Sequence, residues 1–161
     1  MVGRDDQKKV LASVVVVTQE GRKSQKFYYR ILKNQVLLVS LDRPDSPLGY
    51  PEVILKAGDG PQTWQDERNT GASIDPQVMH IDAKSEAKPA RFLFGQSRAI
   101  LEATFDASVG GKDGVQIHQV ADYASGVGLV EMRETTKVKK DEQKRTLTLV
   151  KFEPPPTSEG I

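Results

Sequence analysis

The sequence predicts an all-β protein of about ten antiparallel strands, mainly a meander, curved into a barrel or an open half-barrel. Runs of β-branched and aromatic residues recur along the chain, and clusters of turn residues separate them. No stretch shows the apolar period of an amphipathic helix convincingly. Curvature is expected because about ten strands rarely stay flat in one sheet.

The first half of the chain reads as a meander followed by two short strands. Four consecutive valines in the first run favour a strand, because β-branched side chains lose rotamer freedom in a helix. Lys33-Asn34 is a tight turn, and the proline-rich stretch 42–51 is a loop or a sheet edge. The strands are expected, in order, at 10–18, 26–32, 35–41, 52–56 and 62–67.

The second half continues the all-β pattern. Residues 78–86 alternate, with Val78, His80 and Asp82 on one face and the intervening residues on the other. The stretch 97–108 fits a strand or a helix, and a strand is favoured. Turns are expected at 109–114 and at the charged stretch 139–145. The further strands are expected at 90–94, 97–108, 115–123, 127–138 and 146–152.

A chain of 161 residues fits one domain. We expect a flexible N-terminus over 1–8, a single β domain over 9–152 and a disordered tail over 153–161, which contains three consecutive prolines.

The composition of the chain limits which classes of partner it is expected to bind. The net charge of +1, from 23 basic and 22 acidic residues, provides no long-range field for nucleic acid. No apolar run reaches the ~20 residues of a membrane-spanning helix, so no transmembrane segment is predicted. The absence of cysteine excludes disulfides and thiol chemistry. No cofactor is predicted.

No motif predicts catalysis. Around Gly111-Lys112 the two other positions of a phosphate-binding loop hold aspartates, and Gly126-Val127-Gly128 lies between strands without a following helix. "GQSRA" at 95–99 lacks the parallel α/β context of a nucleophile elbow. An enzyme, of hydrolase type, therefore ranks third among the functions considered.

Two further residue sets are weak candidates for binding. His80, His118 and Asp82 form a two-histidine, one-carboxylate metal set if their strands pair, although isolated histidines usually lie at the surface, so no metal site is predicted. Four aromatic residues are the candidate contacts of an apolar ligand: Tyr28, Tyr29, Trp64 and Tyr123.

The string Tyr123-Ala-Ser-Gly-Val-Gly-Leu-Val130 carries a resemblance. It resembles the Tyr-Ala-Pro-Gly-Val-Gly-Leu-Val signature near the C-terminus of uncharacterised exported bacterial β proteins, with Ser125 in place of proline. The resemblance covers about residues 97–152. It implies a lipoprotein-carrier-like sheet half-closed around an apolar cavity, and it transfers no catalytic residue. We expect Gly126 to supply a positive φ at a bend and Gly128 a bulge or close approach.

These observations predict a non-enzymatic module of the cell envelope that binds an apolar small molecule or lipid, or an envelope protein. The alternative is a structural or assembly module without a ligand cavity. The resemblance implies a periplasmic or envelope location, with an export signal presumed removed. A cytoplasmic location is the alternative, because residues 1–9 are charged and lack an apolar segment.

Overall fold

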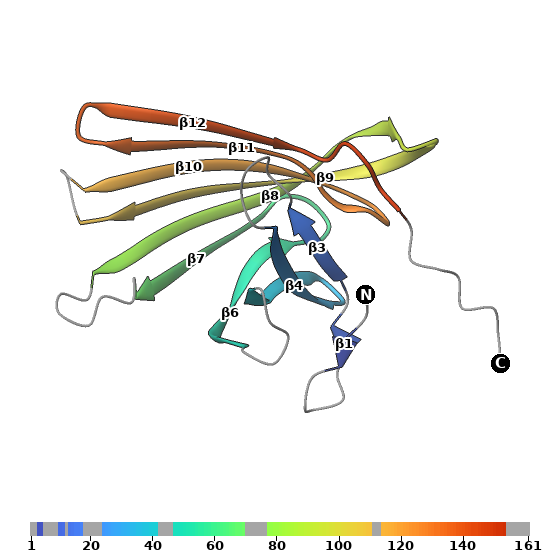
Figure 1. The fold of residues 1–161 in the computed structure, drawn as a ribbon, viewed down its shortest axis with the longest axis horizontal. Coiled ribbons are helices and arrows are strands. Elements are labelled where there is room, and N and C mark those ends of the chain that lie inside the picture. The colour runs from blue at the N-terminus through green and yellow to red at the C-terminus, as the bar shows by residue number, and fades with distance from the viewer. Residues whose placement is uncertain are drawn as a thin grey trace. The chain divides into compact units, whose positions relative to one another are not determined.

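The computed structural model describes residues 3–4, 10–11, 13–17, 24–41, 47–69, 77–110 and 114–153. In these ranges the chain is all-β with antiparallel pairing and no helix, which confirms the predicted class (Figure 1). The described residues accordingly include no helix long and apolar enough to cross a membrane. The chain divides into two compact units, Met1–Lys56 and Ala57–Ile161, and each is described by itself.

The first unit holds a two-stranded sheet, β1-β2, and a four-stranded antiparallel sheet in the order β3-β4-β5-β6. The predicted meander is confirmed, although its first run forms two strands instead of one. Pro47 and Pro51 lie in an edge strand, where the missing N–H is tolerated. The strands are β1 (Gly3–Arg4), β2 (Val10–Leu11), β3 (Ser13–Val17), β4 (Gln25–Leu32), β5 (Gln35–Leu41) and β6 (Pro47–Lys56).

The second unit is one six-stranded meander in the order β12-β11-β10-β9-β8-β7. Strands β7 and β12 form its two edges. The ambiguous stretch 97–108 lies within β9, so the favoured strand assignment is confirmed. The strands are β7 (Gln62–Asn69), β8 (Val78–Leu93), β9 (Gln96–Val109), β10 (Val115–Ala124), β11 (Gly128–Val138) and β12 (Asp141–Thr148).

The expectation of separate strands at 78–86 and 90–94 is wrong, because β8 runs through both with a bulge between Lys88 and Arg91. Pro89 is tolerated there because β7 pairs with β8 only as far as Ser85, leaving no ladder on that side. The β8–β9 hairpin therefore extends beyond β7 (Figure 1).

The six-stranded sheet has two unlike faces, because alternate residues of each strand point to opposite sides. In β8 the buried residues are Ile81, Ala83 and Ser85, and the residues between them are exposed or half-buried. The predicted alternation of 78–86 is thus confirmed. The side that carries Ile81 and its β9 partner Ala107 is here called the apolar face, and the side that carries His80 is called the charged face.

The C-terminal part differs from the expectation in its boundaries. The turn occupies only Lys139 and Lys140, with Lys139 at φ 55°, and β12 begins at Asp141 instead of residue 146. Cross-strand pairing of Lys137 with Glu142, 3.2 Å between Nζ and Oε2, accompanies this early start.

The terminal predictions lie mostly outside the described residues. Of 1–8 only Gly3–Arg4 is described, paired with β2, and of the tail only Glu153. The single-domain expectation for 9–152 stays a prediction.

Candidate functional site

The Tyr123–Val130 string forms the end of β10, a tight turn and the start of β11. The Val127 N–H donates to the Ala124 carbonyl at 3.1 Å, and Gly126 has φ 73°. These features match a type II turn, whose third residue needs a positive φ. The sequence-based expectation for Gly126 is confirmed. Gly128 also has a positive φ, 98°.

The Arg98 side chain, from β9, connects this turn to the end of β8. Its Nη1 donates to the Ser125 carbonyl at 3.0 Å, and its Nε donates to the Leu93 carbonyl at 3.1 Å. A Cβ on Gly126 would lie 3.2 Å from the same Nη1. Glycine at 126 is therefore favoured for two reasons: it adopts the positive φ without strain, and it leaves room for the Arg98 guanidinium.

The Ser125 N–H also has a partner, since it donates to the Ala99 carbonyl at 2.9 Å. Proline, the usual residue of the signature that the string resembles, has no N–H and would lose this bond. In this chain the backbone bond at 125 therefore disfavours proline at that position.

Beside this turn lies the end of the β8–β9 hairpin. Phe94 and Gly95 form its turn with φ of 52° and 79°, as in a type I′ turn. Positive φ is unusual for a bulky residue such as Phe94, and it costs roughly 1–2 kcal/mol. The ring of Phe94 packs on Phe152, with 5.9 Å between centroids, and Phe92 is 75% exposed. Phe92, Phe94 and Phe152 are here called the aromatic tip.

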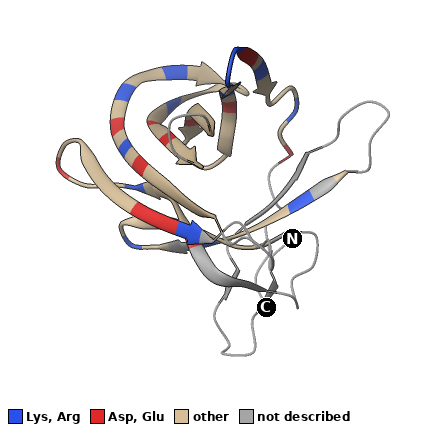
Figure 2. Cartoon of the chain, turned by 90° about the vertical axis from the view of Figure 1, so that its left-hand side faces the viewer, with Lys and Arg blue, Asp and Glu red and all other residues tan. Residues whose placement is uncertain are grey.

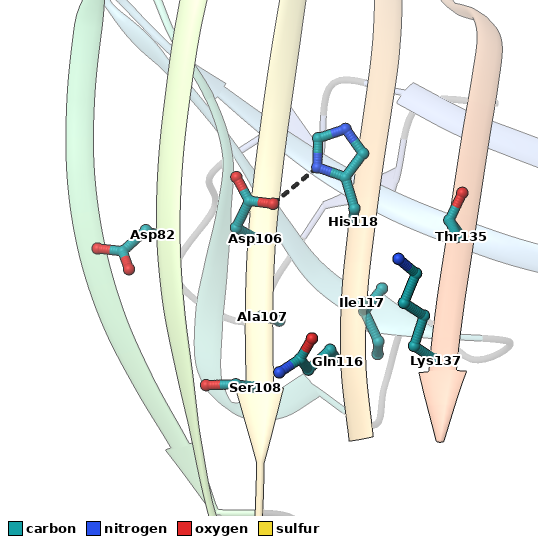
Figure 3. Close-up of a pocket in the computed structure, with 9 residues that line it drawn as sticks. All are labelled: Asp82, Asp106, Ala107, Ser108, Gln116, Ile117, His118, Thr135 and Lys137. Atoms are coloured by element: carbon teal, nitrogen blue, oxygen red, sulfur yellow. Dashed lines mark hydrogen bonds and ion pairs between the residues drawn. The ribbon is translucent and has the colours of Figure 1, made fainter. Parts of the chain in front are cut away.

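A pocket of about 280 Å³ lies on the charged face, over β8 to β11 (Figure 3). His118 Nδ1 lies 2.7 Å from Asp106 Oδ1, and Asp82 is the register partner of Asp106 on the next strand. The rest of the lining is mostly polar: Ala107, Ser108, Gln116, Ile117, Thr135 and Lys137. A histidine oriented by a carboxylate can act as a general acid or base, and this pair lies among the pocket's ionisable side chains.

The candidate metal ligands His80, His118 and Asp82 do not form one site. Strand β9 separates β8 from β10, so His80 and His118 lie on strands that do not pair. His80 Nδ1 pairs with Glu67 at 3.0 Å, and the Asp82 carboxylate accepts from Gln65 at 2.6 Å. Among the described residues, no group of three or more histidine and acidic side chains is placed to hold a metal ion.

The four candidate ligand contacts fall in both units. Tyr28 is buried in the first unit against Val39, and burial raises the pKa of Tyr29 to about 12. Trp64 is buried in the second unit and meets Phe105 edge-on, 5.8 Å between ring centroids. Tyr123 is half-buried on β10.

Sequence reasoning missed a row of four carboxylates on the charged face. Glu86, Glu102, Asp122 and Glu131 are successive register partners on β8, β9, β10 and β11. Like charges directly opposite one another destabilise a sheet unless cations intervene. Figure 2 shows basic residues interspersed with acidic ones along the strands of the chain.

Two lysines and two arginines neutralise this carboxylate row. Lys88 Nζ lies 2.8 Å from Glu86 and 3.2 Å from Glu102. Lys88, followed by Lys84, holds the pKa of Glu86 below its usual value, and Glu86 chiefly raises the pKa of Lys88. Arg133 contacts Glu131 at 3.3 Å and Glu102 at 3.9 Å.

Asp122 is the most buried member, at 7% exposure. Its Oδ2 lies 3.3 Å from Nη1 of Arg91, whereas its Oδ1 has no hydrogen-bond partner among the described residues. Burial raises the pKa of Asp122 despite the nearby Arg91, because removing a carboxylate from water disfavours its charged form.

Comparison with protein-family models, with curated proteins and with solved structures found no match for this chain.

Proposed function

We propose that the chain is a non-enzymatic module of the bacterial cell envelope that binds another envelope protein through its aromatic tip. The observation that carries the proposal is Phe92, 75% exposed next to a hairpin turn that holds Phe94 in a left-handed conformation. Exposed aromatic side chains are enriched at binding interfaces, and backbone strain tends to occur at functional sites. Val150, 90% exposed, lies two residues before Phe152 and adds apolar surface.

An apolar ligand, such as a lipid, is the second candidate. The supporting observation is the apolar face, where Trp64 and Phe105 pack together beside small residues. Ala103 and Ala121 are opposite one another on β9 and β10, and such small residues permit a sheet to curve with that face inside. This feature supports the open half-barrel. The 0% exposure of both alanines favours instead a structural or assembly module without a cavity.

The envelope location rests on the resemblance of the Tyr123–Val130 string to exported proteins. The turn geometry supports that resemblance at Gly126, where positive φ is required, and Ser125 departs from it. A hydrolase ranks third, supported by the His118–Asp106 pair in the polar pocket.

Two matched substitutions test the proposal. Phe92→Ser should abolish retention of envelope proteins by the immobilised protein, while leaving the melting temperature unchanged. Val138→Ser removes another exposed apolar side chain, at the far end of β11, and should change neither property. Equal retention by the parent and both variants would refute the proposal. A rise in melting temperature with fatty acids would indicate the ligand-binding alternative.

A further inference from the structure

Arg91 connects strands that are not neighbours. It lies on β8, just after the bulge, yet its Nη1 lies 3.3 Å from Asp122 on β10 and 3.8 Å from Glu131 on β11. Strand β9 separates β8 from β10, so the guanidinium reaches over β9 on the charged face. This contact ties the protruding half of the β8–β9 hairpin to the body of the sheet.

Arg91 contacts a carboxylate, that of Asp122, whose surroundings disfavour its ionised form. Asp122 is nearly buried, and its register partners on both sides, Glu102 and Glu131, are also acids. Neither Oδ1 of Asp122 nor Nε of Arg91 has a hydrogen-bond partner among the described residues, and both atoms are buried. The Arg91 side chain is 39% exposed, so this half-exposed ion pair with unsatisfied atoms recovers little of the desolvation cost of Asp122.

We propose that Asp122 is a pH-sensitive latch: when ionised it holds Arg91 and the hairpin end, and when protonated it releases them. The charged groups that act on Asp122 are Arg91 from β8, Glu102 from β9, and Glu131 and Arg133 from β11. Glu86 and Lys88 of β8 lie on the same face, where they adjoin Glu102. A proton on Oδ1 would turn this unpaired acceptor into a donor, on a residue whose register partners Glu102 and Glu131 are both acceptors. The inference does not depend on the proposed function.

The direction of the pH effect follows from burial. Because burial raises the pKa of Asp122, the folded state binds this proton more tightly than the unfolded state does. The contribution of Asp122 to stability is therefore present below its unfolded pKa and is lost as the pH rises through its folded pKa. Acidification should therefore stabilise the whole fold through the burial of a neutral Asp122. It should loosen the hairpin end locally, because Arg91 attracts only the ionised carboxylate.

Hydrogen exchange tests the latch directly. In the parent, the protection of residues 88–98, corrected for intrinsic rates, should fall roughly tenfold as the pH drops through the Asp122 titration, since a charge-assisted contact is lost. Asp122→Asn should show the low protection at every pH. Glu142→Gln, at an exposed carboxylate of β12, should keep the parent profile.

A measurement on the parent protein alone tests the latch even if a variant fails to fold. The ¹³C carboxyl shift of Asp122 should titrate above the usual range of aspartate and coincide with the change in protection. Flat protection of 88–98 across that titration, or a pH-dependent profile retained in Asp122→Asn, would overturn the latch.

Discussion

Replacing Gly126 with valine tests the account of the β10–β11 turn. At φ 73° a side chain costs roughly 1–2 kcal/mol, and a β-branched one costs more. The new Cβ would also lie 3.2 Å from Nη1 of Arg98. Since that atom ends a flexible side chain, it can move, at the loss of its bond to the Ser125 carbonyl, worth about 0.5–1.5 kcal/mol. The two contributions are of similar size, and the expected total is about 2 kcal/mol or more.

Urea denaturation with an unchanged m-value measures this loss. Ser125→Ala is the matched control, because it keeps the backbone N–H and carbonyl that form the turn, and it should be nearly neutral. In an Arg98→Ala background the cost of Gly126→Val should fall by the arginine contribution. A Gly126→Val variant within about 0.5 kcal/mol of the parent would refute the reasoning.

Three further outcomes are expected. Ser125→Pro should not stabilise the protein, because the lost bond to Ala99 offsets the ~0.4–1 kcal/mol gained from unfolded-state entropy; a higher urea midpoint would contradict this. A titration followed by tyrosine absorbance should show a group that ionises near pH 12 and is absent in Tyr29→Phe. Because burial raises this pKa, the contribution of neutral Tyr29 to the free energy of unfolding is fully present below pH 10.0 and is lost as the pH rises towards 12. Replacing both His80 and His118 with glutamine should leave the melting temperature equally insensitive to zinc and to chelator, and a zinc-dependent rise confined to the parent would restore the metal hypothesis.

The strands were predictable wherever side-chain pattern decides them. The strand at valines 14–17 follows from their β propensity, and the strand at 78–86 follows from alternating burial. A sequence displays both patterns directly. The turn at Phe94-Gly95 was missed because a phenylalanine rarely takes a positive φ, so no common turn signal marks it. Pro89 is acceptable inside β8 because β7 pairs with β8 only as far as Ser85 and a bulge lies between Lys88 and Arg91, and side-chain pattern displays neither feature.

The carboxylate row depended on register, which the sequence does not fix. Counting outward from the β10–β11 turn, Ala124 pairs with Gly128, and a regular ladder would then pair Asp122 with Val130. The irregularity between Asp122 and Tyr123 shifts the partner to Glu131. A shift of one residue in register exchanges the two faces of a strand. The sequence therefore shows the four acidic residues but does not predict that they lie side by side on one face.

The aromatic tip is best tested in cells of the source organism, with a photo-crosslinking residue in place of Phe92. The control places it at Lys144, an exposed position on the edge strand β12. A discrete crosslinked envelope protein is expected from position 92 and none from position 144. Identical patterns from the two positions, or crosslinks to lipid alone from position 92, would contradict it.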